Sequence, residues 1–274
     1  MGRAGAAPSP APAAVFTPAW DVTAEAPNAQ PDRLAKLAQP ASPGLVEFSS
    51  KWRDRLATSN SSHPGLVEQF RRLAATLHEA RRLNGLRTLM VTSATPGEGK
   101  TLTAVNLSLV LAESYRAQVL LVDADLRRPS IPRAADLGDG SGLSNALLAA
   151  TEQKLALLKV VPGLTLLPAG HAIANSIEAL TSPRMRQIVE EAEATFDWVI
   201  LDAPPVGATA DARLLSQLVG GTLFVVRAGQ TQCPDAQRGI ESLGRENILG
   251  VVFNGVTDLQ DGSYYGYGAS NHNG

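Results

Sequence analysis

Cysteine is almost absent from this sequence, because Cys233 is the only one among 274 residues. A single cysteine excludes an internal disulfide and any cysteine-rich zinc site. The four histidines are scattered along the chain and offer no metal-ligand spacing. We therefore expect a cytoplasmic protein, since that compartment keeps thiols reduced.

Long apolar runs and a strong charge of one sign are also missing. No segment approaches the run of about 18 apolar residues that a membrane-spanning helix needs. Prolines interrupt the N-terminal stretch MGRAGAAPSPAPAAVF before it could form a signal-peptide core. The formal net charge is −2, so no basic field favours a nucleic-acid partner. We expect a protein that is neither secreted nor membrane-spanning, so that any membrane location comes from a partner.

Composition divides the chain into four parts. Residues 1–43 are rich in Ala and Pro and poor in large apolar side chains, which predicts a disordered arm. A linker with a short helix is expected over 44–63. The main domain is expected over 64–257 and opens with an amphipathic helix from 66 to 84. The remaining residues, 258–274, form a Gly-, Ser- and Asn-rich tail that we expect to be flexible.

A phosphate-binding loop is the clearest motif. Residues 94–101 read ATPGEGKT and match G-x4-G-K-[ST], except that Ala replaces the first glycine. An apolar run precedes the loop and a helical pattern follows it, which is the strand–loop–helix context required. There, backbone N–H groups face the phosphates, Lys100 reaches the outer ones and the Thr101 hydroxyl ligates Mg²⁺. The predicted nucleotide-binding residues of this stretch are Pro96, Gly97, Glu98, Gly99, Lys100, Thr101 and Leu102.

Short apolar runs recur after the loop and alternate with helical patterns. These runs cover 118–125, 164–170, 197–205, 221–229 and 249–256. Together they predict an α/β P-loop NTPase with a mostly parallel central sheet covered by helices on both faces. Ligands bind beyond the carboxyl ends of such strands, so Asn254 in the last run joins the nucleotide-binding candidates.

Acidic residues lie at the ends of two of these runs. Asp202 is placed like the carboxylate that holds Mg²⁺ in P-loop NTPases. Asp123 or Asp125 could accept a proton from a hydroxyl or water nucleophile, and geometry decides which. The competing interpretation is that a strand-end aspartate only caps the following helix. The late element FNGVTD lacks the lysine of a guanine-reading motif, which favours ATP over GTP.

Taken in order, SATPGEGKT, LLVDADLRRP and DWVILDAPP closely resemble three motifs of the bacterial tyrosine kinases (BY-kinases) of capsule and exopolysaccharide systems. The resemblance covers about residues 64–270. That family is related to the MinD/ParA-like ATPases, whose early signature lysine is missing from TPGEGKT, and this difference favours the kinase branch.

The resemblance implies a role for each matching residue. ATP and Mg²⁺ are the implied cofactors, bound by Lys100 and Thr101. Asp123 is the implied base toward a tyrosine hydroxyl, while Asp125 and Asp202 arrange the Mg²⁺. Arg127 occupies the arginine position of the family's D-x-D-x-R.

Tyrosine is concentrated near the C-terminus: three of the four tyrosines are Tyr264, Tyr265 and Tyr267. In the resembling family a tyrosine cluster at this place is the autophosphorylation substrate, so we predict these three as phosphoacceptors. The alternative is a low-complexity tail without a chemical role.

The implied function is an ATP-dependent protein tyrosine autokinase that regulates exopolysaccharide or capsule polymerisation and export. The implied partners are the cytoplasmic segment of a membrane polysaccharide chain-length regulator and an opposing tyrosine phosphatase. The kinase would then lie peripherally at the inner face of the membrane. A MinD/ParA-like ATPase switch and a nucleotide-dependent scaffold without kinase activity are the alternatives.

One position departs from the family. Its E-x2-R-x2-R helix, associated with packing of subunits into a ring, aligns with Glu68, Arg71 and position 74, which is Ala74. The missing arginine argues against a stable ring, so we expect any homo-oligomer to be weak.

Overall fold

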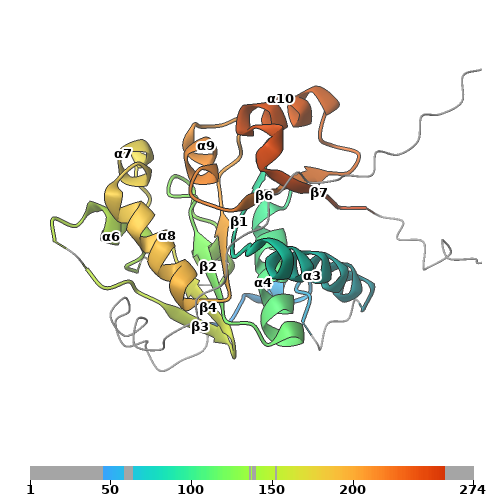
Figure 1. Ribbon diagram of the computed structural model, residues 1–274, viewed down its shortest axis with the longest axis horizontal. Helices are drawn as coiled ribbons and strands as arrows, with labels where there is room; N and C mark the ends of the chain where they lie inside the picture. The colour runs from blue at the N-terminus through green and yellow to red at the C-terminus, as the bar shows by residue number, and fades with distance from the viewer. Residues whose placement is uncertain (1–45, 59–63, 136, 138–139, 152, 257–274) are drawn as a thin grey trace, which may run out of the picture.

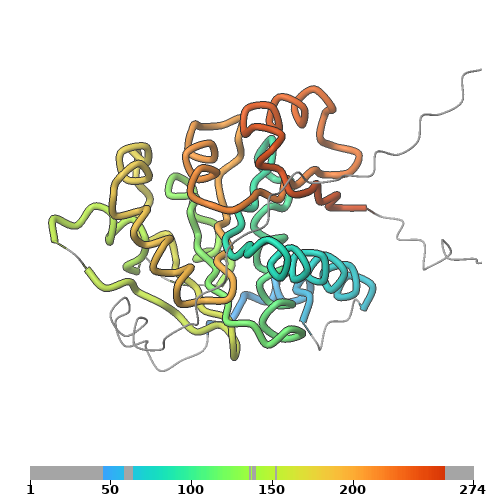
Figure 2. The backbone as a smooth tube through the Cα atoms, viewed as in Figure 1, coloured from blue at the N-terminus to red at the C-terminus, as the bar shows by residue number. Residues whose placement is uncertain are grey.

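The computed structural model describes residues 46–58, 64–135, 137, 140–151 and 153–256, which are coloured in Figures 1 and 2. The predicted arm over 1–43 and the predicted phosphoacceptors Tyr264, Tyr265 and Tyr267 lie outside the described residues.

A seven-stranded sheet forms the centre of the molecule, in the order β3-β4-β2-β5-β1-β6-β7. Neighbouring strands run parallel, except that β3 pairs antiparallel with β4 at one edge. The strands are β1 (Thr88–Ser93), β2 (Val119–Asp123), β3 (Leu158–Val161), β4 (Leu164–Leu167), β5 (Trp198–Asp202), β6 (Gly221–Arg227) and β7 (Ile248–Asn254). The predicted mostly parallel sheet is confirmed. β3 was not expected, because only Val160 of this strand is buried and its apolar pattern is weak.

Helices cover both faces of this sheet, as Figure 1 shows. They are α2 (Ser50–Arg53), α3 (Pro64–Asn84), α4 (Lys100–Tyr115), α5 (Ile131–Ala134), α6 (Leu143–Leu148), α7 (Ser176–Leu180), α8 (Pro183–Thr195), α9 (Asp211–Ser216), α10 (Cys233–Leu243) and the 3-10 turn η1 (Arg245–Asn247). Successive residues of β1 enter two different cores. Leu89 and Val91 pack in the core of α3 and α4, and Met90 packs in the core of α8 and α9. A strand buried on both faces explains the near-continuous apolar runs of the sequence.

The segment 46–58, which we expected to be a linker, packs against the α3–α4 side of the sheet. Phe48, Leu56 and Ala57 are buried in that core. The backbone N–H of Ala57 donates to Asn106 Oδ1 at 2.8 Å, and Asn106 Nδ2 donates to the Arg55 carbonyl oxygen at 3.1 Å. Asn106 lies on α4, which begins at the phosphate loop, so the segment is fastened to the helix that carries the site.

Helix α3 carries the residues aligned with the ring-forming helix of the family. Glu68 and Arg71 are exposed, whereas Ala74 is fully buried against the domain's own core. Glu68 pairs with Arg72 at 3.5 Å, within the same helix. Position 74 therefore has no room for a side chain that contacts another subunit, and the weak self-association expected from the sequence stays a prediction.

This burial predicts the outcome of restoring the arginine. Ala74→Arg should lower the free energy of unfolding by roughly 2–4 kcal/mol, because it forces a long cation into a packed apolar site. Ala75→Arg is the matched control, since residue 75 is exposed on the same helix and should change stability by less than about 0.5 kcal/mol. Urea unfolding of the two variants measures both values. Equal stability of the two variants would show that position 74 can accept a large side chain.

Candidate nucleotide-binding and catalytic site

The loop between β1 and α4 takes a shape that glycine makes possible. Gly97 and Gly99 have φ values of 86° and 95°, in the left-handed region that side chains disfavour. A Cβ atom at Gly99 would lie 1.8 Å from Asn254 Nδ2. Position 99 therefore needs glycine for its backbone conformation and also for the close approach of β7.

Side chains behind the loop hold it in this shape. Glu98 is 3% exposed and accepts the Thr95 backbone N–H at 2.8 Å and the Thr231 hydroxyl. Asn254 Nδ2 donates to the Glu98 carbonyl oxygen at 2.8 Å, and Arg227 Nη1 donates to the Gly97 carbonyl oxygen at 2.9 Å. The structure thus places Glu98 and Asn254, both predicted to bind nucleotide, in bonds that brace the loop from β6 and β7.

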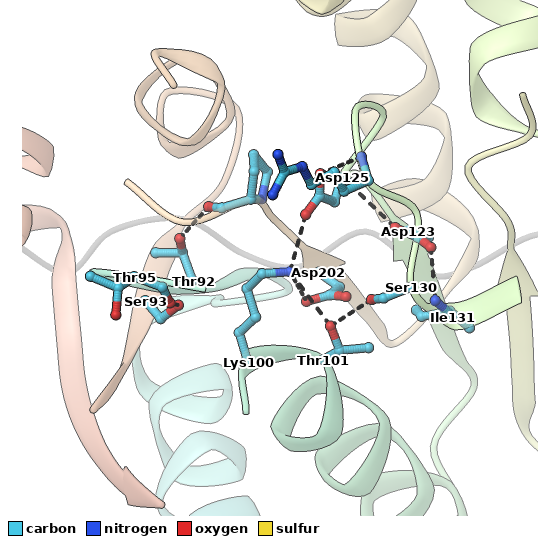
Figure 3. A network of polar contacts seen from close by, with 12 residues as sticks. Thr92, Ser93, Thr95, Lys100, Thr101, Asp123, Asp125, Ser130, Ile131 and Asp202 are labelled. Atoms are coloured by element: carbon cyan, nitrogen blue, oxygen red, sulfur yellow. Dashed lines mark hydrogen bonds and ion pairs between the residues drawn. The ribbon is translucent and has the colours of Figure 1, made fainter. Parts of the chain in front are cut away.

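Lys100 lies between two of the predicted carboxylates, as Figure 3 shows. Its Nζ atom is 3.2 Å from Asp125 Oδ2 and 3.7 Å from Asp202 Oδ1. Burial alone would lower the pKa of Lys100, but the charges of Asp202 and Asp125 outweigh it and raise that pKa. The lysine is therefore a fixed positive charge at the first turn of α4, where phosphate oxygens would meet it.

Asp202 is a buried carboxylate whose charged partner is Lys100. It is 0% exposed, and neither of its oxygen atoms has a hydrogen-bond partner among the described residues. Burial raises the pKa of Asp202, because the charge of Lys100 only partly offsets the loss of water. Nearby, the hydroxyls of Thr101 and Ser130 lie 2.8 Å apart (Figure 3). A buried carboxylate that Lys100 only partly neutralises, beside a threonine hydroxyl, fits a divalent cation.

The protein supplies only part of such a cation site. Within the described ranges, no three acidic, histidine or cysteine side chains are placed to enclose a metal ion by themselves. Mg²⁺ usually takes one or two carboxylates and completes its shell with water and phosphate oxygens. The arrangement of Thr101, Asp125 and Asp202 is therefore suited to a cation that arrives with a nucleotide.

Asp123 is fully buried at the end of β2, beside Asp202 of β5 in the sheet register. Its two oxygens accept the backbone N–H groups of Asp125 at 3.3 Å and Ile131 at 3.1 Å. Burial, together with the charge of Asp202, raises the pKa of Asp123 to about 8. The three predicted carboxylates thus meet at one place, and Asp123 can hold or release a proton near neutral pH.

A cavity of about 710 Å³ opens in front of the loop. Asp125 and Arg127 lie on its wall, with Lys100 and Thr101. It is also lined by residues that the sequence did not reveal as site residues: Trp52, Arg55, Arg128, Ser130, Arg133 and Arg227. The stretch LRRPSIPR directly after D-x-D could have indicated three of these. No local pattern indicated Trp52, which reaches the cavity from a segment that precedes the domain helix α3.

Arg127 is oriented by Asp211, a buried acid at the start of α9. Its Nε atom donates to Asp211 Oδ2 at 3.1 Å, and Asp211 is 0% exposed. The Ser176 hydroxyl donates to the same oxygen at 2.5 Å. Asp211 therefore fixes the position of the Arg127 guanidinium, and Arg127 also lines the cavity.

This fold and this loop define a P-loop nucleotide-binding protein. In agreement, the ParA family model, described as NUBPL iron-transfer P-loop NTPase, matches residues 86–258. In the described part of the chain, no helix is both long enough and apolar enough to cross a bilayer.

Comparison with known proteins identifies the branch of that class. The tyrosine-protein kinase YwqD of Bacillus subtilis is 36% identical over 203 residues, which are 73% of this chain and 85% of YwqD. The tyrosine-protein kinase Etk of Escherichia coli is 34% identical over 230 residues, which are 79% of this chain but 31% of Etk. The solved kinase domain of Escherichia coli ETK has a TM-score of 0.69 at 31% identity and covers 88% of this chain and 92% of that domain. The chain belongs to the bacterial tyrosine-protein kinase family, as its motifs predicted, and it spans about a third of the length of Etk.

Proposed function

We propose that this chain is an ATP-dependent tyrosine kinase that phosphorylates tyrosines of its own C-terminal tail. One observation supports this more than any other: Lys100 lies between Asp125 and Asp202 at the loop. Asp123, whose pKa burial raises to about 8, lies beside Asp202 in the sheet. The relatives named tyrosine-protein kinases support the choice of tyrosine as the acceptor.

Each residue then has a separate role. Lys100 neutralises charge on the outer phosphates, and Arg127 adds a second positive charge from the wall of the cavity. Thr101, Asp125 and Asp202 would hold Mg²⁺, which supplies charge neutralisation across the phosphate oxygens. Backbone N–H groups from Gly97 to Leu102 bind the phosphates, while Pro96, which has no N–H, shapes the start of the loop.

Transfer needs one proton acceptor. The tyrosine Oη attacks the γ-phosphorus, the bond from that phosphorus to the bridging oxygen breaks, and ADP leaves with the electron pair. Asp123 in its ionised form takes the hydroxyl proton, and its raised pKa makes that form a stronger base than an ordinary carboxylate. Asp125 lines the cavity and is the alternative base.

The proposal extends to the cellular role. The family resemblance supports action in exopolysaccharide or capsule polymerisation and export. The kinase would lie at the inner face of the membrane, bound to the cytoplasmic segment of a chain-length regulator and opposed by a tyrosine phosphatase.

The acceptor assignment predicts the result of removing three hydroxyls. Replacing Tyr264, Tyr265 and Tyr267 with Phe should remove most of the phosphotyrosine that forms with ATP, because Phe keeps the ring and lacks the nucleophile. Mass spectrometry of the full chain measures the label site by site. Tyr115→Phe is the matched control and should leave the label unchanged. Label retained at Tyr115 in the triple variant would contradict the assignment.

A further inference from the structure

A second cavity, of about 1010 Å³, adjoins the nucleotide cavity. The two cavities share three wall residues, Arg127, Arg128 and Arg133. Away from these arginines the second cavity is lined mainly by small or apolar residues, which include Leu137, Ala156 and Leu158. A ligand in this cavity would therefore have one end at a cationic boundary and the rest against an apolar wall.

Two of the shared arginines are free to bind a ligand. Arg127 is already paired with Asp211. By contrast, Arg128 and Arg133 are exposed, and neither guanidinium makes an ion pair with another residue in the ranges that the structure describes. Pro129 and Pro132 fix the backbone between them, so the two cations project from a stiff segment. Such a boundary favours anionic groups that approach the phosphate site from the second cavity.

We propose that the second cavity binds the acceptor peptide and selects tyrosines that follow acidic residues. This rests on the proposed kinase function, and it assigns a substrate class to the same site. A peptide is the ligand that fits because the arginines belong to both cavities: its acidic residues meet them while its tyrosine continues to the phosphates.

The chain's own tail has the matching charge. Asp258 and Asp261 precede Tyr264 by six and three residues, and no lysine or arginine follows Arg245. Three extended residues span about 10 Å, which places a carboxylate and a tyrosine hydroxyl in adjoining cavities. Ligand pockets for drug-sized molecules measure about 300–1,000 Å³, so the second cavity is large enough for several residues of a peptide.

Direct binding tests the proposal. A fluorescent peptide of residues 255–268, the Asp peptide, is titrated with the full chain in the presence of a non-hydrolysable ATP analogue. Two further peptides carry Asn or Lys at both positions 258 and 261 and are called the Asn peptide and the Lys peptide. We expect the Asn peptide to bind about fivefold more weakly, from two exposed ion pairs of about 0.5 kcal/mol each, and the Lys peptide more weakly still. Equal affinity for the three peptides overturns the proposal.

Two variants locate the binding. Arg133→Glu should remove the preference for the Asp peptide over the Lys peptide, because the new carboxylate offsets the charge of Arg128, whereas Arg186→Glu, at an exposed position on α8, should leave the preference unchanged. Ala156→Trp should fill the cavity and weaken the Asp peptide, whereas Ala150→Trp, at an exposed position, should not. An unchanged preference in Arg133→Glu overturns the proposal even if Ala156→Trp does not fold.

Phosphotransfer to the same peptides is measured separately. Selective binding of the Asp peptide without any phosphotyrosine supports the peptide site and contradicts the kinase function. If all three peptides bind with equal affinity and all become phosphorylated on tyrosine, the kinase function is supported. The proposed selection of tyrosines that follow acidic residues is then overturned.

Discussion

Lys100→Met is expected to weaken ATP binding by at least about thirtyfold and to abolish self-phosphorylation. The lysine is the positive charge that stands 3.2 Å from Asp125 and 3.7 Å from Asp202. Without it, the outer phosphates of ATP would face two carboxylates, so repulsion would replace attraction. Truncating one partner of a buried charge pair costs about 2–5 kcal/mol, so the affinity for ATP should fall by about thirtyfold or more.

Calorimetric titration with Mg-ATP and detection of phosphotyrosine measure the two losses. Lys159→Met is the matched control, because this exposed lysine lies on the edge strand β3 and donates to Thr165. It should bind ATP like the wild type. Thermal unfolding of the nucleotide-free variants checks that Lys100→Met is folded, and unchanged ATP affinity in the folded variant would refute the assignment of the phosphate loop.

Asp123→Asn should reduce phosphotransfer much more than nucleotide binding. The amide keeps the size of the side chain but cannot accept the tyrosine proton, and a positioned base contributes about 10²–10⁴ to a rate. Because burial raises the pKa of Asp123 to about 8, the nucleotide-free protein at pH 7 already holds this group mostly protonated, and the neutral amide should be tolerated. Initial rates of self-phosphorylation and titration with Mg-ATP separate the two effects.

The same substitution has a consequence for stability. The pKa of Asp123 in the folded protein lies above its ordinary value of 3.8, so the folded state binds the proton more tightly than the unfolded state. This contribution to the free energy of unfolding is greatest below pH 3.8, declines as the pH rises and is lost above about 8. Asp123→Asn should therefore flatten the decline between pH 5 and pH 8 in the nucleotide-free protein.

Asp235→Asn, at a partly exposed position in the first turn of α10, is the control for both measurements and should differ little from the wild type. Phosphorylation near the wild-type rate in Asp123→Asn would exclude this residue as the base. The role would then pass to Asp125, which borders the cavity and bonds Lys100.

The convergence of the three carboxylates could be predicted from the sequence. Asp123 and Asp202 each end an apolar run long enough for a buried strand, and Asp125 follows two residues later. Parallel strands bring their carboxyl ends to one edge of the sheet, so these residues had to meet near the loop. The loop itself follows from local chemistry, because left-handed conformations at two positions require glycine there.

Contacts between distant segments could not be predicted in the same way. Trp52 and Arg55 reach the cavity because the Ala57 N–H bonds Asn106, 49 residues further along the chain. Ala74 is buried because it lies on the face of α3 that packs against α4. A helical pattern alone shows only that one side of α3 is apolar. The side chain of Glu98 turns inward to brace the loop, a contact that its place in the motif did not indicate, and the predicted contact of Glu98 with the nucleotide stays a prediction.

The destination of the γ-phosphate tests the account most directly. The purified chain is incubated with Mg²⁺ and γ-labelled ATP, and protein-bound label, phosphoamino acids and free phosphate are measured together. We predict label on the protein as phosphotyrosine, mostly within residues 257–274, and its loss in Lys100→Met. Free phosphate released without labelled protein would contradict this and would instead indicate an ATPase switch of the MinD/ParA kind.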